Sequence, residues 1–367
     1  MTTTGTDSER LRLGTRGSRL ALTQSGQVAE ALMAAGAPGE GSGGLSIDLV
    51  TVRTDGDGDR TPLRQLGGVG VFAARLRHAL LDGEVDLVVH SFKDLPTQPV
   101  EGLEVICVPS REDPRDALCA RDGLTLATLP DGARVGTGSP RRAAQLLAAR
   151  PDLEVVDLRG NVPTRLARVR GLEAVGVGTD EPVAPARADA AGDLDAVVLA
   201  LSGLRRLGLE HCASEVLDLE TMLPAPAQGA LAVEARTGED SAELARAVAV
   251  LDDEPTRLAV TAERALMARL GAGCAAPVGA WAHLRGGSRE PRVLVLRAVV
   301  TSLDGGQEVG CELSTELPEA TEGPEAAGDA AEAVRAAEAL GARAAEVLLE
   351  DGAGQIVDLH ANKPRRD

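Results

Sequence analysis

Arginine recurs at one kind of position in this chain, directly after a short apolar run that is typical of a buried strand. Guanidinium groups keep their charge and bind carboxylates through two parallel hydrogen bonds. The carboxyl ends of parallel strands share one sheet edge, so these arginines would converge there. Any one of them alone would more often be a solvated helix start that pairs with Asp or Glu. Four recurrences beside Gly, Ser, Thr and Asn favour a site for an anion with several carboxylates. They comprise Arg16 and Arg19, Arg141 and Arg142, Arg159 and Arg165, and Arg205 and Arg206.

A lysine and an aspartate follow another apolar run, in the segment His90–Pro96 (HSFKDLP). Of the 38 basic residues only Lys93 and Lys363 are lysines, which hints that Lys93 has a role that arginine cannot fill. Asp94 is either a structural turn cap or a catalytic carboxylate. Carboxylates near a reacting centre stabilise developing positive charge and relay protons.

Cys274 lies among small residues in LGAGCAAPVG, between a predicted helix and a predicted strand. A thiolate is a strong nucleophile, and small neighbours would let a bulky group approach and attach to the sulfur. The alternative is a buried, inert cysteine, which is the more common fate of an isolated one.

Two glycine- and aspartate-rich motifs are weak. Asp55, Asp57 and Asp59 open like a calcium loop, but Arg60 stands where such a loop needs glycine. Gly67–Phe72 (GGVGVF) precedes a predicted helix and could hold an anion on free N–H groups. It lacks the last glycine of a dinucleotide fingerprint. No metal site is predicted.

Hydrophobic periodicity predicts the elements that must position these residues. Strand and helix alternate from Leu11 to about Leu209, which predicts α/β layers. The predicted strands are Leu11–Gly14, Leu45–Val52, Asp86–His90, Val105–Val108, Val155–Leu158 and Ala196–Ala200. The predicted helices are one capped by Ser18, then Phe72–Leu81, Pro140–Ala149 and Val162–Arg170.

The last third predicts a small α+β domain. Its expected elements are a helix at Pro255–Arg269, strands at Val278–Leu284 and Val293–Val300, and a helix at Ala326–Leu349. Gly171–Gly192 lacks periodicity and is rich in Gly, Ala and Pro, so we interpret it as a mobile surface insertion.

Composition limits the function classes. The 367 residues carry a formal net charge of -18, which argues against nucleic acids and anionic membranes as partners but not against a small anion in a locally basic site. The aromatic residues Phe72, Phe92 and Trp281 are few, so Leu, Val and Ala must fill the cores. The five scattered cysteines, the lack of an apolar leader and the absence of a long apolar run predict a cytoplasmic protein.

Taken together, these segments resemble the porphobilinogen deaminase (hydroxymethylbilane synthase) family. The matching stretches occur in family order from about residue 11 to 285. They are LGTRGSRLALTQ, GGVGVF, DLVVHSFKDLP, REDPRDAL, VGTGSPRR, LRGNVPTRL, LALSGLRRLGL, LPAPAQGALAVE, VTAERALMARL and GAGCAAPVG.

The resemblance implies two α/β domains like those of type II periplasmic binding proteins, and a small C-terminal α+β domain. The expected limits are 11–110 with about 229–248 for domain 1, 111–224 with the insertion 171–192 for domain 2, and 252–360 for domain 3. It also implies a monomeric transferase that condenses four porphobilinogen molecules head to tail, releases ammonia and hydrolyses the product to hydroxymethylbilane. The rival hypothesis is a non-catalytic two-lobed protein that binds a polycarboxylate.

The resemblance further implies a dipyrromethane cofactor, attached through a thioether to Cys274, and assigns the catalytic carboxylate to Asp94. Implied cofactor contacts are Ser18, Asp57, Lys93, Thr137, Ser139, Arg141, Arg142, Arg165 and Gly203. Implied substrate contacts are Arg16, Gln24, Phe72, Arg159 and Arg206. Gln65 and Val69 replace lysines that are frequent in the family.

Overall fold

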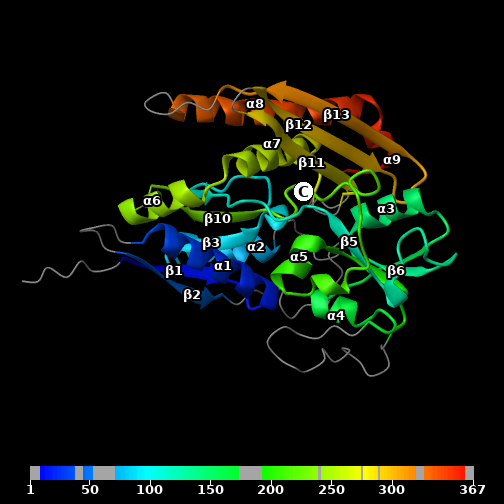
Figure 1. Cartoon of the computed structure of the whole chain (residues 1–367). Coiled ribbons are helices and arrows are strands. Elements are labelled where there is room, and N and C mark those ends of the chain that lie inside the picture. The colour runs from blue at the N-terminus through cyan, green and yellow to red at the C-terminus, as the bar shows by residue number, and fades with distance from the viewer. Residues whose placement is uncertain are drawn as a thin grey trace, which may run out of the picture. The chain divides into compact units, whose positions relative to one another are not determined.

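The structure is a computed structural model that describes residues 9–37, 44–52, 71–172, 192–238, 241–273, 276–287, 290–319 and 326–359. The chain divides into two compact units (Figure 1). The first comprises Met1–Arg111 and Ala230–Arg257, and the second comprises Glu112–Gly229 and Leu258–Asp367. Several predictions lie outside the described residues, namely those on Asp57, Gln65, Val69, Cys274, the glycines of GGVGVF and most of the insertion 171–192.

The first unit is built on a five-stranded sheet in the order β2-β1-β3-β10-β4. β1 pairs in parallel with β2 and β3, whereas β10 enters from much later in the chain and pairs antiparallel with β3 and β4. The strands are β1 (Glu9–Thr15), β2 (Leu45–Thr51), β3 (Leu87–Ser91), β4 (Leu103–Cys107) and β10 (Leu231–Arg236).

Helices cover both faces of this sheet, since its strands carry apolar side chains on both sides. α1 (Arg19–Ala35) and α6 (Ala242–Leu251) share one hydrophobic cluster with the sheet. α2 (Val71–Leu81) packs on the opposite face through Leu76 and Leu80 against Val88. The predicted strands and helices of this unit are confirmed within a few residues.

The second unit contains a comparable sheet in the order β7-β6-β8-β5-β9. β6 is parallel to β7 and β8, and β5 is antiparallel to β8 and β9. The strands are β5 (Asp116–Ala120), β6 (Arg134–Gly136), β7 (Glu154–Val156), β8 (Ala196–Ala200) and β9 (Glu215–Val216). The helices are α3 (Pro140–Ala149), α4 (Val162–Leu166) and α5 (Leu201–Arg206).

The prediction of a helix over Val162–Arg170 is wrong at its carboxyl end, because α4 stops at Leu166. Val169 instead forms a parallel bridge with Leu194, and the Arg170 amide donates to the Leu194 carbonyl. These hydrogen bonds take backbone groups that a longer helix would have needed for itself.

The rest of the second unit is a three-stranded antiparallel sheet of β11 (Val278–Gly287), β12 (Glu290–Thr301) and β13 (Glu308–Glu316). Most of α7 (Glu254–Leu270) also belongs to it, from Leu258 on, as do α8 (Ala326–Glu350) and α9 (Ala353–Ile356). α8 lies along β12 and β13 in Figure 1. β13 was not predicted from the sequence, although its side chains alternate between exposed and half-buried positions as those of an edge strand do.

The predicted fold class is therefore confirmed, with two α/β sheets that each mix parallel and antiparallel strands and a small α+β part. The second unit has separate hydrophobic clusters for its α/β part and its C-terminal part. The three domain limits stay a prediction. No helix in the described part of the chain has both the length and the apolar character that crossing a bilayer requires.

Candidate active site

The first unit presents Lys93 and Asp94 on a short 3-10 turn, Phe92–Asp94, that begins where β3 ends. Asp94 is exposed and Lys93 is half-buried. The amide of Phe92 donates to the carbonyl of Ala230 at 3.1 Å, which ties the turn to the residue before β10. A carboxylate is thus held at the carboxyl edge of the sheet, where ligands of α/β folds bind.

The start of α1 supplies three further predicted residues. Ser18 caps the helix, since its hydroxyl accepts from the Ala21 amide at 3.3 Å. Gln24 is buried and its amide group exchanges hydrogen bonds with the Ser91 hydroxyl at 3.1 and 3.2 Å. Arg16 follows β1 and is half-buried. Gln24 therefore fixes the end of β3, and its assignment as a substrate contact stays a prediction.

The second unit gathers four predicted residues around the start of α3. Ser139 caps this helix, and its own amide donates to the Thr137 hydroxyl at 3.2 Å. Gly138 lies so close to the chain that follows β7 that an added Cβ would come within 2.5 Å of the Leu158 carbonyl oxygen. The VGTGSPRR motif therefore forms a close turn in which the hydroxyls of Thr137 and Ser139 accept backbone amides.

Arg141 and Arg142, from the first turn of α3, both bind the buried carboxylate of Asp116 at the start of β5. Arg141 Nη2 lies 2.8 Å from Asp116 Oδ2, and Arg142 Nη2 lies 2.7 Å from Oδ1. The exposed fractions are 3%, 5% and 0% for Arg141, Arg142 and Asp116. Gln228 Nε2 adds a further contact, donating to Asp116 Oδ1 at 2.9 Å. The arginines do pair with an aspartate, but in the interior and not as solvated helix starts.

Burial raises the pKa of Asp116, but Arg141 and Arg142 outweigh it and the net pKa lies below the usual range. The ionised carboxylate therefore stabilises the fold above its unfolded pKa of about 4, and this stabilisation is lost as the pH falls through the lower folded pKa.

We expect Asp116→Asn to lower the free energy of unfolding by about 3–5 kcal/mol at pH 7, because two buried guanidinium groups lose their counter-charge. Urea denaturation at several pH values checks this, and the difference from the parent protein should shrink as the pH falls below about 4. Asp122→Asn is the matched control, since Asp122 forms an ion pair with Arg121 while its side chain is 68% exposed. An equal loss in both variants would contradict the prediction.

The remaining predicted arginines follow β7 and β8. Arg165, in α4, is half-buried and its Nε donates to the Gly160 carbonyl at 2.7 Å. Arg206, in α5, donates from Nη2 to the Gly229 carbonyl at 2.7 Å. Burial lowers the pKa of Arg206, and Glu112 opposes this shift. Arg159 is half-buried in the segment between β7 and α4.

The predicted residues thus divide into two groups, one in each unit. Gly203 is buried within α5. The side chain of Phe72 lies outside the described residues, although its backbone begins α2. The first group is Arg16, Ser18, Gln24, Lys93 and Asp94, and the second is Thr137, Ser139, Arg141, Arg142, Arg159, Arg165, Gly203 and Arg206.

Sequence reasoning missed four buried polar residues of the two units: Asp116, Gln228, His90 and Glu234. Asp116 had a signal, since it opens the otherwise apolar run DALCA. Glu234 likewise follows the apolar run ALAV. A carboxylate beside a buried strand needs a buried cation or donor, and this rule would have found both.

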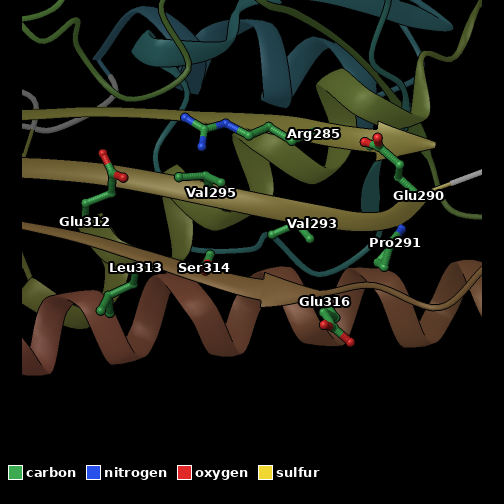
Figure 2. A pocket seen from close by; sticks show the side chains of 10 residues that line it. Arg285, Glu290, Pro291, Val293, Val295, Glu312, Leu313, Ser314 and Glu316 are labelled. Atoms are coloured by element: carbon green, nitrogen blue, oxygen red, sulfur yellow. The ribbon is translucent and has the colours of Figure 1, made fainter.

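A hollow of about 470 Å³ lies on the C-terminal sheet (Figure 2). Its lining includes Arg285 on β11, Val295 on β12 and Glu312 on β13. None of its lining residues is one that the sequence assigns to the site.

Comparison with known proteins identifies the chain's relatives. A family model described as the dipyromethane cofactor binding domain of porphobilinogen deaminase matches residues 11–244, and one for the C-terminal domain of that enzyme matches residues 257–350. A porphobilinogen deaminase of Cutibacterium acnes is 52% identical over 358 residues, covering 97% of this chain and 99% of the relative. One of Micrococcus luteus is 50% identical over 384 residues, covering 97% and 98%.

Among solved structures, similar chains include a marine metagenome TRAP solute binding protein specific for aromatic acid ligands. It has 12% identity and a TM-score of 0.34, with 70% of this chain and 76% of that chain covered. A TRAP solute binding protein from Rhodoferax ferrireducens has 12% identity and a TM-score of 0.33, with 66% and 73% covered. The two family models account for most of the sequence, and on that basis this chain belongs to the porphobilinogen deaminase family.

Proposed function

We propose that this protein is a porphobilinogen deaminase, a transferase that joins four porphobilinogen molecules head to tail with release of ammonia and then hydrolyses off hydroxymethylbilane. The observation that carries the proposal is the placement of Asp94. Its exposed carboxylate follows a strand end that Gln24 and Ser91 fix, in a protein of this family.

The chemistry of the reaction suits this arrangement. Loss of ammonia from the aminomethyl group of porphobilinogen leaves a positively charged electrophile, which a nearby anion stabilises without acting as a strong base. Asp94 supplies that anion in the proposal. Lys93 and the arginines neutralise the carboxylates that each pyrrole carries, and guanidinium groups do so without titrating away.

The second unit's donor set fits dipyrromethane, a group with several carboxylates. Hydroxyl and guanidinium donors lie together at the start of α3, and Ser139 and Arg141 are among them. Arg141 Nε is buried and has no hydrogen-bond partner among the described residues, so this donor is not used within the described part of the chain. Attached to Cys274, the cofactor would supply the pyrrole end to which the substrate units are added.

We expect Arg165→Leu to lower the rate of product formation by about tenfold or more, because it removes a guanidinium group that binds carboxylates in the proposal. Thermal stability should change little, because the side chain is only half-buried. Arg142→Leu should behave differently and lose stability, since it removes a partner of buried Asp116. Steady-state kinetics and thermal unfolding of both variants check this contrast. A purely thermal defect in Arg165→Leu would contradict it.

The direct test is to incubate the purified full chain with porphobilinogen and measure substrate consumed, ammonia released and hydroxymethylbilane formed. Four porphobilinogen molecules should disappear, and four ammonia molecules appear, for each hydroxymethylbilane. Binding of porphobilinogen without ammonia release would overturn the proposal in favour of a non-catalytic polycarboxylate-binding protein.

The proposal includes a monomer, as the family resemblance implies, located in the cytoplasm, as the composition predicts. Light scattering after size-exclusion chromatography tests the monomer, and fractionation of the source cells tests the location. A stable dimer or an exported protein would contradict these parts and leave the proposed chemistry unaffected.

A further inference from the structure

Three buried polar side chains form a network in the first unit, close to the turn that carries Asp94. Glu234 on β10 accepts from Arg77 Nε at 3.0 Å and from Arg77 Nη2 at 2.8 Å. Its other oxygen lies 3.1 Å from His90 Nε2, at the end of β3. The exposed fractions of Arg77, His90 and Glu234 are 9%, 6% and 2%. The three residues thus form a continuous chain of contacts from α2 through β10 to β3.

Strand register explains how the network forms. His90 is opposite Ala232, and Val88 is opposite Glu234, so the side chains of His90 and Glu234 share one face of the sheet. The pairing of β10 with β4 shifts register between Val233 and Glu234. α2 covers this face and brings Arg77 onto the carboxylate.

The charge state of Glu234 is set by its neighbours. Burial raises the pKa of Glu234, but the hydrogen bonds from His90 and Arg77 lower it by more, so the net pKa lies below the usual range. The carboxylate therefore stays ionised in the interior. Well-packed apolar residues would stabilise such a position equally well or better, so stability alone is a weak reason for the network.

The network ends at His90, one residue before the end of β3. The residue after His90 is Ser91, which Gln24 holds from the opposite face of the sheet. The end of β3 is thus fixed on both faces, and the turn that carries Lys93 and Asp94 begins at the next residue. Small displacements of a catalytic group cost about 100-fold in rate, so such anchoring matters for turnover.

We propose that Glu234 and Arg77 are positioning residues that act through His90 to hold Asp94 in its productive place. The inference rests on the proposed deaminase function. It predicts a defect in turnover, with substrate binding and cofactor attachment left intact, because neither residue lies on the turn itself.

The test uses full-length, cofactor-loaded protein and compares Glu234→Gln with the parent. We expect kcat to fall about 10- to 100-fold while KM changes less than about twofold. Because Glu234→Gln leaves Arg77 buried without a counter-charge, the double variant Arg77→Met/Glu234→Gln, which removes both charges, is measured as well. It should fold and show the same loss of kcat.

The decisive readout is the coupling to Asp94. In an Asp94→Asn background Glu234→Gln should reduce kcat by less than about twofold further, because both changes act on the same step.

Asp86→Asn is the matched control: it breaks a charged contact with Arg12 at the opposite end of β3 and should leave kcat unchanged in either background. Unchanged kcat in Glu234→Gln and in Arg77→Met/Glu234→Gln would overturn the inference. An equal fold-loss of kcat from Glu234→Gln in the parent and in the Asp94→Asn background would overturn it too. A parent protein that does not release ammonia would instead overturn the proposed function.

Discussion

Asp94→Asn is expected to lower kcat at least about 100-fold, because the amide keeps the shape of the side chain but removes the negative charge that stabilises the cationic electrophile. Asp94 is exposed, so its replacement removes no buried contact and the free energy of unfolding should change by less than about 0.5 kcal/mol. Steady-state kinetics with porphobilinogen, thermal unfolding and intact-protein mass of the same preparation are the measurements.

Asp82→Asn provides the control for this prediction, since Asp82 is an exposed aspartate just after α2 in the same unit. It should match the parent in both rate and stability. Near-normal turnover in Asp94→Asn would show that the key carboxylate is another residue and would leave the turn at the end of β3 with a structural role only.

Cys274→Ala is expected to abolish the covalently attached mass and with it almost all product formation. In the parent protein the intact mass should exceed that of the sequence by two linked pyrrole units, because the thioether survives denaturation. Mass spectrometry of the purified variant should return the mass of the polypeptide alone. An unmodified parent protein with full activity would contradict the covalent mechanism.

The other cysteines are suitable controls. Burial raises the pKa of Cys107 and Cys119 to about 12 and that of Cys311 to about 11, so these thiols carry little thiolate at neutral pH. Cys212 is buried as well, and its pKa is raised for the same reason. Cys311→Ala should therefore keep the added mass and the activity.

Much of the first unit could be predicted from the sequence because local patterns decide it. The run DLVVH is apolar on both faces, as a central strand must be, and it forms β3. Ser18 precedes an amphipathic stretch and caps α1 as expected. In the second unit, the prediction of a helix at Pro140–Ala149 is likewise confirmed as α3, with Ser139 as its cap.

The partners of those side chains could not be predicted. Arg141 and Arg142 lie in α3, whereas Asp116, which binds both, lies about 25 residues earlier in β5. The predicted carboxyl end of the helix Val162–Arg170 is wrong for the same kind of reason, because Leu194 takes the hydrogen bonds of its last backbone groups. Such competition depends on which distant strands are neighbours, and no local pattern encodes it.

The family, the alternation of strands and helices, and the residue types at the strand ends can all be read from the sequence. Which charges are buried together depends on how the chain packs. Glu234 meets His90 across 144 residues and Arg77 across 157, through an antiparallel pairing of β10 with β3 and the packing of α2. Burial makes such contacts strong and specific, and burial exists only once segments far apart in the chain have packed.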